Sequence, residues 1–323
     1  MHRILLFALI LASLGLCLPA PAQVEMEWSL RHSRTLLMEP VWATVSIGNQ
    51  TGRNLDLTPN GNARLRFDVE DRPTSLVRET GQALVRRPVI IPPGETREVE
   101  VNLLEGYRIL HGQSYMLLPV LEFGGTRFAG PRLSLEVQPG LVLLERRFGM
   151  PNQADARTVS LRQLHRERTD RLFFRLDAPT AGTCLGCYEL GRLIRFFVPR
   201  LEQDSEGVFH VLHQSAPDRF VHSRIDSDGV PRGTAFYIAQ AGQIRLVREA
   251  DGQVAVTGGT PFEEDPERPG VLTAPSLPPS NPYAGQQIGE LPAKGRAGPA
   301  AVRPAPARPA PRPASPAEEA VVW

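Results

Sequence analysis

The sequence predicts an all-β protein with three parts: an N-terminal immunoglobulin-like sandwich, a second module built as a β-meander, and a disordered tail. Three observations lead to this prediction. Apolar and polar residues alternate in short runs, which is typical of half-buried strands. Gly, Pro, Asn and Asp separate these runs, and such residues favour turns. About half of the 31 prolines lie in the last fifth of the chain, where a packed core is therefore not expected.

Residues 1–22 have the pattern of a cleaved signal peptide. His2 and Arg3 precede an apolar run over residues 5–16, and Ala20-Pro21-Ala22 supplies small residues for cleavage. The apolar run is shorter than the roughly 20 residues that cross a bilayer, and no second segment is apolar enough to be a transmembrane span. We therefore expect an exported protein, periplasmic or secreted after cleavage.

Residues 23–139 predict the first module. Val41, Ala43, Val45 and Ile47 alternate with other residues and are followed by a turn-rich segment. The same alternation returns in residues 64–69, 96–103 and 132–137, with further strands expected over residues 89–91 and 112–120. About seven short strands with a turn every 8 to 12 residues are typical of a β-sandwich.

Three motifs of this module resemble the immunoglobulin-like or fibronectin-type modules of bacterial surface and periplasmic proteins. They are Glu39-Pro40-Val41 leading to Asn49-Gln50-Thr51-Gly52, then Pro92-Pro93-Gly94-Glu95, and Gly112-Gln113-Ser114-Tyr115. The resemblance implies that Tyr115 occupies the tyrosine-corner position. The paired cysteines of antibody-type domains are absent. Such modules serve mostly as spacers or binding platforms, so the resemblance implies no reaction.

A connector over residues 140–157 is expected to lead into a β-meander over residues 158–260. Its strands are predicted at residues 158–165, 171–176, 188–197, 207–214, 219–225, 234–239, 244–248 and 254–257. Asp228-Gly229 and Asp251-Gly252 form a weak repeat, but the module is too short for a complete propeller. A small barrel, a sandwich and an open or partly propeller-like sheet remain as alternatives. Residues 261–323 are predicted to be a disordered tail rich in Pro, Ala and Arg.

Cys184-Leu185-Gly186-Cys187 contains the two cysteines of the mature chain. A loop precedes this motif and a strand is predicted to follow it, whereas a redox-active pair needs a helix start beneath its first thiol. Zinc would need two further ligands. Three interpretations stay open: a local disulfide or pair of inert thiols, a redox pair, and half of a metal site.

Histidines of the second module offer another candidate site. Because side chains alternate along a strand, His210 and His213 should point to opposite faces. If residues 215–218 form a four-residue hairpin loop, His213 lies opposite Phe220 and His222 opposite Val211. His213 and His222 then become diagonal neighbours, with Arg224 beside them. This face is either part of a ligand or metal site or simply the polar side of a sheet.

Acidic residues near the turns offer a further alternative. Asp204, Glu206, Asp226 and Asp228 supply oxygens of the kind that calcium prefers. However, no glutamate stands in the closing position of a calcium loop, and turn chemistry explains Asp226-Ser227-Asp228-Gly229 without a metal.

Composition and motifs favour a binding role. The net charge of +1 predicts no general affinity for nucleic acid or an anionic membrane. The sequence contains none of the usual nucleophile, phosphate-binding, dinucleotide or metalloprotease motifs, so no cofactor is expected. We therefore expect a non-enzymatic binding or structural protein of the cell envelope, whose partner is an envelope protein or a glycan. The alternative is a thiol-redox or metal-dependent protein centred on Cys184 and Cys187.

Overall fold

The computed structural model describes residues 24–72, 75–150, 156–264, 272–273 and 289–290. The predicted signal peptide and most of the predicted tail lie outside these ranges. The predicted all-β class is confirmed, because the described elements are strands apart from one helical turn, α2 (Leu103–Gly106). Asn102 caps this turn by accepting a hydrogen bond from the Leu104 amide. No helix in the described part of the chain has the length and apolar run needed to cross a membrane.

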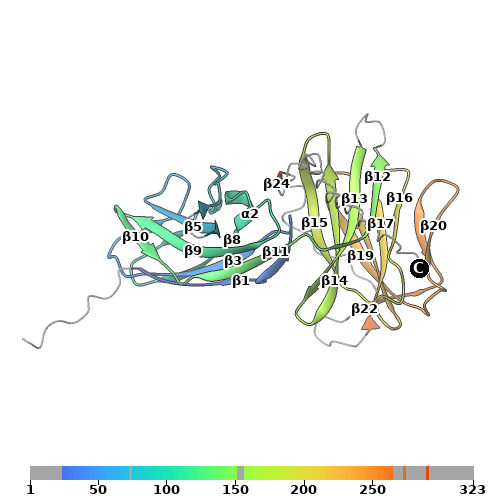
Figure 1. The fold of residues 1–323 in the computed structure, drawn as a ribbon. Helices are drawn as coiled ribbons and strands as arrows, with labels where there is room; N and C mark the ends of the chain where they lie inside the picture. The colour runs from blue at the N-terminus through green and yellow to red at the C-terminus, as the bar shows by residue number, and fades with distance from the viewer. Residues whose placement is uncertain (1–23, 73–74, 151–155, 265–271, 274–288, 291–323) are drawn as a thin grey trace, which may run out of the picture. The chain divides into compact units, whose positions relative to one another are not determined.

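Two sheets form the first half of the protein (Figure 1). One has the order β1-β3-β8, and the other the order β2-β11-β9-β5-β6, with β10 paired to β9. All neighbours are antiparallel except β2 and β11. The strands are β1 (Val24–Leu30), β2 (Arg34–Leu36), β3 (Trp42–Asn49), β5 (Ala63–Arg72), β6 (Ser75–Leu76), β8 (Thr96–Asn102), β9 (Ser114–Phe123), β10 (Thr126–Ala129) and β11 (Leu133–Gln138), with the short pair β4 (Leu55–Asp56) and β7 (Ile90–Ile91) beside them.

The predicted alternation explains how these sheets pack. Ala43, Val45 and Ile47 of β3 are fully buried, and Phe67 and Val69 of β5 lie in the same core. Burying one such side chain stabilises the fold by roughly 1.5–3 kcal/mol. The two sheets therefore share one apolar core.

The side chain of Tyr115 on β9 bonds back to the backbone just upstream of its strand. Its hydroxyl donates a hydrogen bond to the carbonyl of His111, four residues upstream, at 2.9 Å. Its ring is almost completely buried. This bond fixes the path of the chain where it enters β9.

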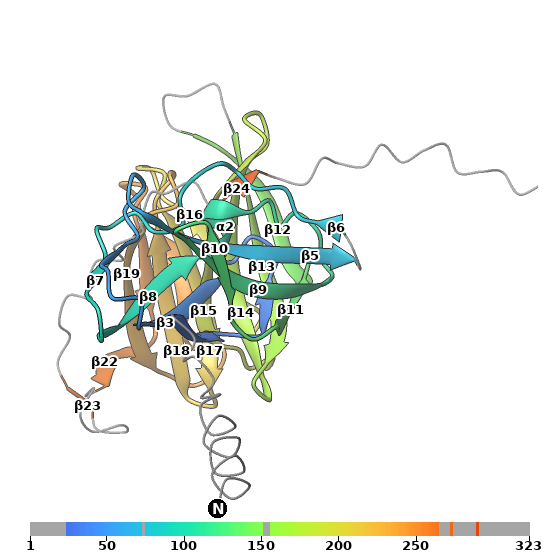
Figure 2. The ribbon, with the colours of Figure 1, turned by 90° about the vertical axis from the view of Figure 1, so that its left-hand side faces the viewer.

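Two further sheets form the second half, and each is mostly a meander of successive antiparallel strands (Figure 2). The first has the order β12-β13-β14-β15-β24 and the second the order β16-β17-β18-β19-β22-β23, while β20 and β21 form a separate hairpin. Their bounds are β12 (Leu141–Gly149), β13 (Ala156–Arg166), β14 (Thr169–Ala178), β15 (Thr183–Arg192), β16 (Arg200–Gln203), β17 (Phe209–Ala216), β18 (Arg219–Ile225), β19 (Pro231–Ile238), β20 (Arg245–Arg248), β21 (Val254–Thr257), β22 (Thr260–Glu264), β23 (Leu272–Thr273) and β24 (Gly289–Glu290).

A shared core joins the two meanders into a sandwich. Leu161 and Phe174 from the first sheet pack with Phe209, Val211 and Ile225 from the second. Among the alternatives left by the sequence, the sandwich is therefore the arrangement found. The segment expected as a connector contains strand β12, which pairs with β13 along its whole length. Its apolar residues are consecutive instead of alternating, so the strand pattern was not visible.

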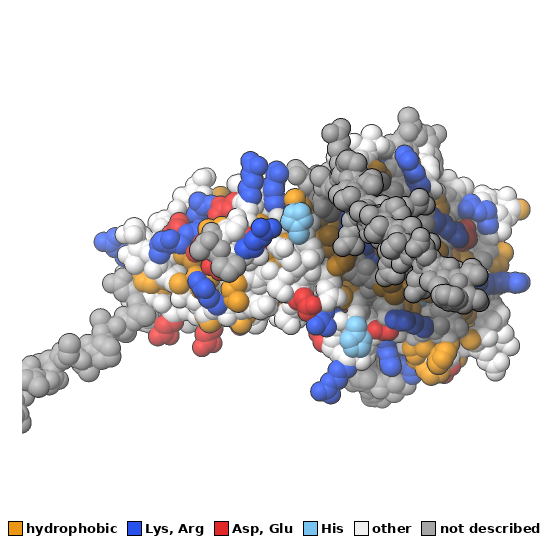
Figure 3. Space-filling model, in the orientation of Figure 1, with side chains coloured by type: hydrophobic (Ala, Val, Ile, Leu, Met, Phe, Trp, Pro, Cys, Tyr) orange, Lys and Arg blue, Asp and Glu red, His pale blue; other side chains and the backbone are white. Residues whose placement is uncertain are grey.

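Arginine side chains are scattered among acidic ones over the face in Figure 3. Several exposed ones are paired, as Arg31 is with Glu100 at 2.6 Å and Arg97 with Glu95 at 2.7 Å. Solvent-exposed pairs of this kind contribute only about 0–1 kcal/mol each. The fold is therefore stabilised mainly by its apolar cores.

Candidate functional site

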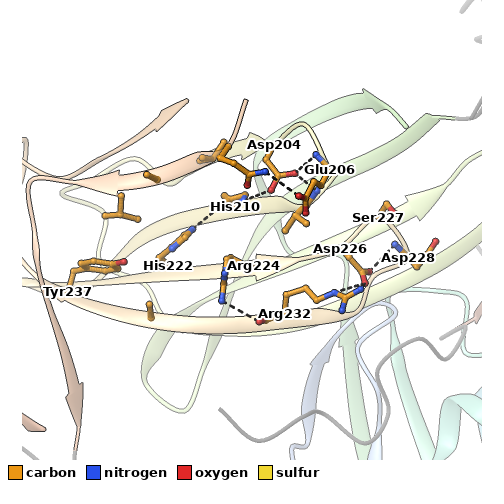
Figure 4. Close-up of a pocket in the computed structure, with 16 residues that line it drawn as sticks. Asp204, Glu206, His210, His222, Arg224, Asp226, Ser227, Asp228, Arg232 and Tyr237 are labelled. Carbon is orange, nitrogen blue, oxygen red and sulfur yellow. Dashed lines mark hydrogen bonds and ion pairs between the residues drawn. The ribbon is translucent and has the colours of Figure 1, made fainter. Parts of the chain in front are cut away.

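A polar cleft of about 980 Å³ opens on the second meander sheet, on the face turned away from the sandwich core (Figure 4). Strands β17, β18 and β19 supply its floor, and the β20–β21 hairpin supplies a wall. The floor carries His210, His222, Arg224 and Tyr237. The cleft thus collects polar side chains from three adjacent strands.

The hairpin that forms the wall is held at both ends. Near its turn, the Ser205 amide donates a hydrogen bond to the Gly252 carbonyl at 3.0 Å. Gly252 has φ +85°, and a Cβ there would lie 2.8 Å from Ser205 Cβ, so only glycine fits. At the other end, Ile244 is buried against Leu212 and Phe220. The hydrogen-bonded turn and the apolar cluster keep the wall in place over the floor.

A hydrogen-bonded chain of three side chains runs along the cleft. Asp204 Oδ2 lies 3.0 Å from His210 Nε2, and His210 Nδ1 lies 3.0 Å from His222 Nε2. All three residues are at least nine-tenths buried. Such a network is strong in a low-dielectric site because water does not compete for its bonds.

Asp204 fixes the tautomers of both rings. A carboxylate only accepts, so His210 Nε2 must carry the proton of that bond, and an imidazole with one proton then accepts at its other nitrogen, Nδ1. His222 therefore donates from Nε2, which leaves its Nδ1 as an acceptor. Among the described residues the hydrogen bond of the His222 ring is the one at Nε2, and none is found at Nδ1. The chain thus presents one unoccupied acceptor.

Burial keeps His222 neutral. Loss of solvation, followed by the charges of His210 and Arg224, lowers the pKa of His222 to about 3. Tyr237 stands beside it, with the ring centroids 6.5 Å apart. At neutral pH the imidazole is therefore a fixed, uncharged hydrogen-bonding group next to an aromatic ring.

Arg224 supplies a cation to the cleft. Its side chain is exposed, and it makes one long hydrogen bond of 3.5 Å to the backbone carbonyl of Arg232. No carboxylate in the described ranges pairs with Arg224, whereas Arg232 is held by Asp226 at 2.8 Å. The Arg224 guanidinium therefore keeps most of its donors for a ligand.

The acidic turn residues serve as turn acceptors. Asp226 Oδ1 accepts the amides of Asp228 at 3.0 Å and Val230 at 2.7 Å. Asp204 Oδ1 does the same for Glu206 at 2.9 Å and Val208 at 2.8 Å. Turn chemistry therefore accounts for these carboxylates, as the sequence suggested, and leaves Asp204 Oδ2 for His210.

The structure does not bring His213 and His222 together. Strand β17 extends to Ala216, so the hairpin turn is shorter than the four residues expected, and a register shift follows Gln214. Consequently His213 pairs with Val221, and His222 pairs with Leu212. The expected register was wrong by one residue, which reverses the face of every side chain. His222 and Arg224 do line one site, and His210 takes the place given to His213.

His213 lies on the opposite face, inside the sandwich. It is fully buried, and neither ring nitrogen has a hydrogen-bond partner in the described part of the chain. Burial lowers the pKa of His213 to about 4. The backbone of Arg192 lies near the ring and opposes this shift in part, but it is not placed to form a regular hydrogen bond with either ring nitrogen. His213 is therefore a neutral core residue and contributes nothing to the cleft.

Cys184 and Cys187 lie within strand β15, which begins at Thr183, whereas the strand was expected to begin only after the motif. Cys184 pairs with Asp177 and Cys187 with Arg175, so both thiols are on one face, because a bulge at Leu185 changes the alternation. Both are free and buried. Burial raises the pKa of both thiols well above the usual value. Both groups therefore remain protonated thiols at neutral pH, and neither is a reactive thiolate.

Within the described residues, no three His, Cys, Asp or Glu side chains are grouped so as to hold a metal ion.

Sequence reasoning missed Asp204 and His210 as partners of His222. The available signal was the shared pattern Asp204-Ser205-Glu206-Gly207-Val208 and Asp226-Ser227-Asp228-Gly229-Val230, which marks equivalent turns at the ends of adjacent hairpins. Aligning those turns would have set the register.

Comparisons with known proteins identify no family. No family model matches the chain, and no curated protein matches it. Among solved structures, it is similar to the sporulation control protein Spo0M from Bacillus subtilis, with 14% identity, 50% of this chain and 83% of that chain covered, and a TM-score of 0.24. It is also similar to a DUF4784 family protein from Bacteroides caccae, with 7% identity, 78% and 84% covered, and a TM-score of 0.18. Likenesses this low carry no argument, so fold and site alone define the class: an all-β protein with a polar cleft.

Proposed function

We propose that the protein is an exported, non-enzymatic binding protein of the cell envelope, and that the cleft of its second half recognises a glycan. One observation carries this proposal: Asp204 and His210 fix His222 as a neutral acceptor facing a cleft of about 980 Å³. Ligand sites of this size use a few well-placed polar groups to orient what they bind.

The groups around His222 complement a sugar. A hydroxyl can donate to His222 Nδ1, since the hydrogen bond of this ring among the described residues is at Nε2. Tyr237 offers an aromatic surface beside it. Arg224 can donate to hydroxyl or carboxylate oxygens. Together these groups suit a hydroxyl-rich ring, including one that carries an acid group.

The same groups argue against catalysis. An efficient general base has a pKa near the working pH, whereas that of His222 is lowered to about 3. The Asp204 carboxylate is occupied by two amides and His210. The thiol-redox alternative gains no support, because Cys184 and Cys187 are buried with raised pKa values.

We infer an immunoglobulin-like role for the first half, as a spacer or platform that carries the binding module. The Tyr115 to His111 contact and the two-sheet core support this. Its partner in the envelope would then be reached through the second half.

A glycan array tests the proposal. The full mature chain is applied to neutral and uronate-bearing oligosaccharides, together with Tyr237→Ala, Arg224→Ala and the control Thr234→Ala, which changes an exposed position of β19 outside the cleft. We expect binding by the wild type and the control, and a loss of at least about tenfold in both cleft variants, as for truncated binding hot spots. Absence of wild-type binding, or equal binding by all four proteins, would overturn the proposal.

A further inference from the structure

The segment between β15 and β16 holds two of the most exposed apolar side chains in the described structure. Phe196 is 84% exposed and Val198 is 68% exposed. They stand two residues apart in Arg195-Phe196-Phe197-Val198-Pro199-Arg200. Leaving an aromatic and a β-branched side chain together in water costs free energy that burial against a partner would recover.

The residues between and beside them anchor the segment. Phe197 packs edge to face on Phe220, with ring centroids 5.2 Å apart and planes at 87°. Leu193 and Pro199 are buried, and the Ile194 amide donates to the Gln214 carbonyl at 2.9 Å. Phe197 and Pro199 therefore face the protein while Phe196 and Val198 face outward, so the exposure follows from anchored neighbours.

Basic side chains flank this apolar tip. Arg192, Arg195 and Arg200 are all exposed. Arg195 contacts Asp170 at 3.4 Å, whereas no carboxylate in the described ranges pairs with Arg192 or Arg200. The tip therefore carries a local excess of positive charge, although the whole chain has a net charge of only +1.

We propose that the apolar tip inserts into the surface of an anionic lipid bilayer, with Phe196 and Val198 entering the interface and the arginines contacting lipid headgroups. Apolar side chains next to Lys or Arg are the pattern of interfacial membrane binding, and each basic residue near an anionic surface strengthens that binding. A protein partner fits this tip less well, because a stable protein interface buries about 800 Å² per partner and two projecting side chains supply a much smaller area. The proposal is independent of the cleft.

Vesicle co-sedimentation tests this inference with the full mature chain. The probes are vesicles of phosphatidylglycerol with phosphatidylethanolamine, and vesicles of phosphatidylcholine alone. The variants are Phe196→Ser/Val198→Ser, Arg192→Gln/Arg200→Gln, and the control Leu76→Ser, which removes an apolar side chain that is 60% exposed in the first half. Circular dichroism checks that each variant is folded.

We expect the wild type and Leu76→Ser to bind the anionic vesicles at least about tenfold better than phosphatidylcholine, with binding weakened by salt. Both double variants should lose most of that binding. The inference is overturned if the wild type ignores anionic vesicles, or if the Phe196/Val198 variant binds as the wild type does. A protein captured through Phe196 in the absence of vesicle binding would also overturn it.

Discussion

His210 and His222 stack with ring centroids 5.1 Å apart and planes at 23°, and one hydrogen bond of 3.0 Å joins their nitrogens. Two imidazoles in this arrangement share a single proton between the facing nitrogens. The direction of that bond is set outside the pair, by the Asp204 carboxylate. The site's hydrogen-bonding character therefore depends on a residue that lies in a turn.

Replacing Asp204 with Asn should reverse the two tautomers. The amide oxygen can still accept from Glu206 and Val208, while the amide nitrogen now donates to His210 Nε2. His210 then carries its proton on Nδ1 and His222 accepts at Nε2. Long-range ¹⁵N–¹H spectra of the two rings measure this directly. Unchanged tautomers in the folded variant would contradict the assignment.

His213 should make the protein sensitive to acid. Its pKa is about 4 in the folded state and about 6.5 when unfolded, so the unfolded state binds more protons between these values. Stability is therefore complete above pH 6.5 and falls as the pH drops towards 4, by about 3 kcal/mol at pH 4 from this residue alone. Urea unfolding at pH 7 and pH 4 measures the difference.

His213→Leu isolates that contribution. The ring nitrogens lack partners in the described structure, so Leu should cost little at pH 7 and should remove about 3 kcal/mol of the loss at pH 4. His111→Gln serves as the control because His111 is exposed. An equal acid loss in the Leu variant and the wild type would show that His213 does not stay neutral.

The two cysteines should resist alkylation in the native protein. Both thiols are buried, and burial raises their pKa values, so little thiolate forms and reagents have no access. Iodoacetamide at pH 8 should add no adduct to the folded chain and two adducts in guanidinium, as read by intact mass. Rapid labelling of the native protein would contradict this placement, and a chain without adducts in guanidinium would indicate a disulfide.

Tyr115→Phe should lower the free energy of unfolding by about 1 kcal/mol while leaving the fold unchanged. The substitution removes the hydroxyl that donates to His111, and a typical hydrogen bond contributes that amount. Tyr107→Phe is a useful comparison, because the Tyr107 hydroxyl accepts the buried Phe67 amide at 2.6 Å, so its loss leaves a donor unpaired. Urea denaturation should rank Tyr107→Phe as the more costly change.

The sequence predicted strands well where one face meets a core and the other meets solvent. The alternation in β3 and β5 placed Ala43, Val45 and Phe67 inward, as found. Strand β12 escaped prediction because its apolar residues 141–144 are consecutive and none of them is fully buried. Apolar and polar residues alternate only where one face of a strand is buried and the other meets solvent, and β12 has no such pair of faces.

The candidate site was harder to predict because strand register decides which side chains meet. A shorter turn and the shift after Gln214 put His210, and not His213, on the same face as His222. The bulge at Leu185 similarly put Cys184 and Cys187 on one face, against the period-two expectation. Composition and alternation carry no information about either irregularity.

The turn at residues 204–207 makes two contacts that shape the cleft. Asp204 orients the imidazoles, and the Ser205 amide holds the hairpin wall at Gly252. A local opening of this turn would release both together. The cleft should therefore behave as one cooperative unit: its amides on both sides should exchange with solvent deuterium at a common rate, and a bound ligand should slow them all by the same factor.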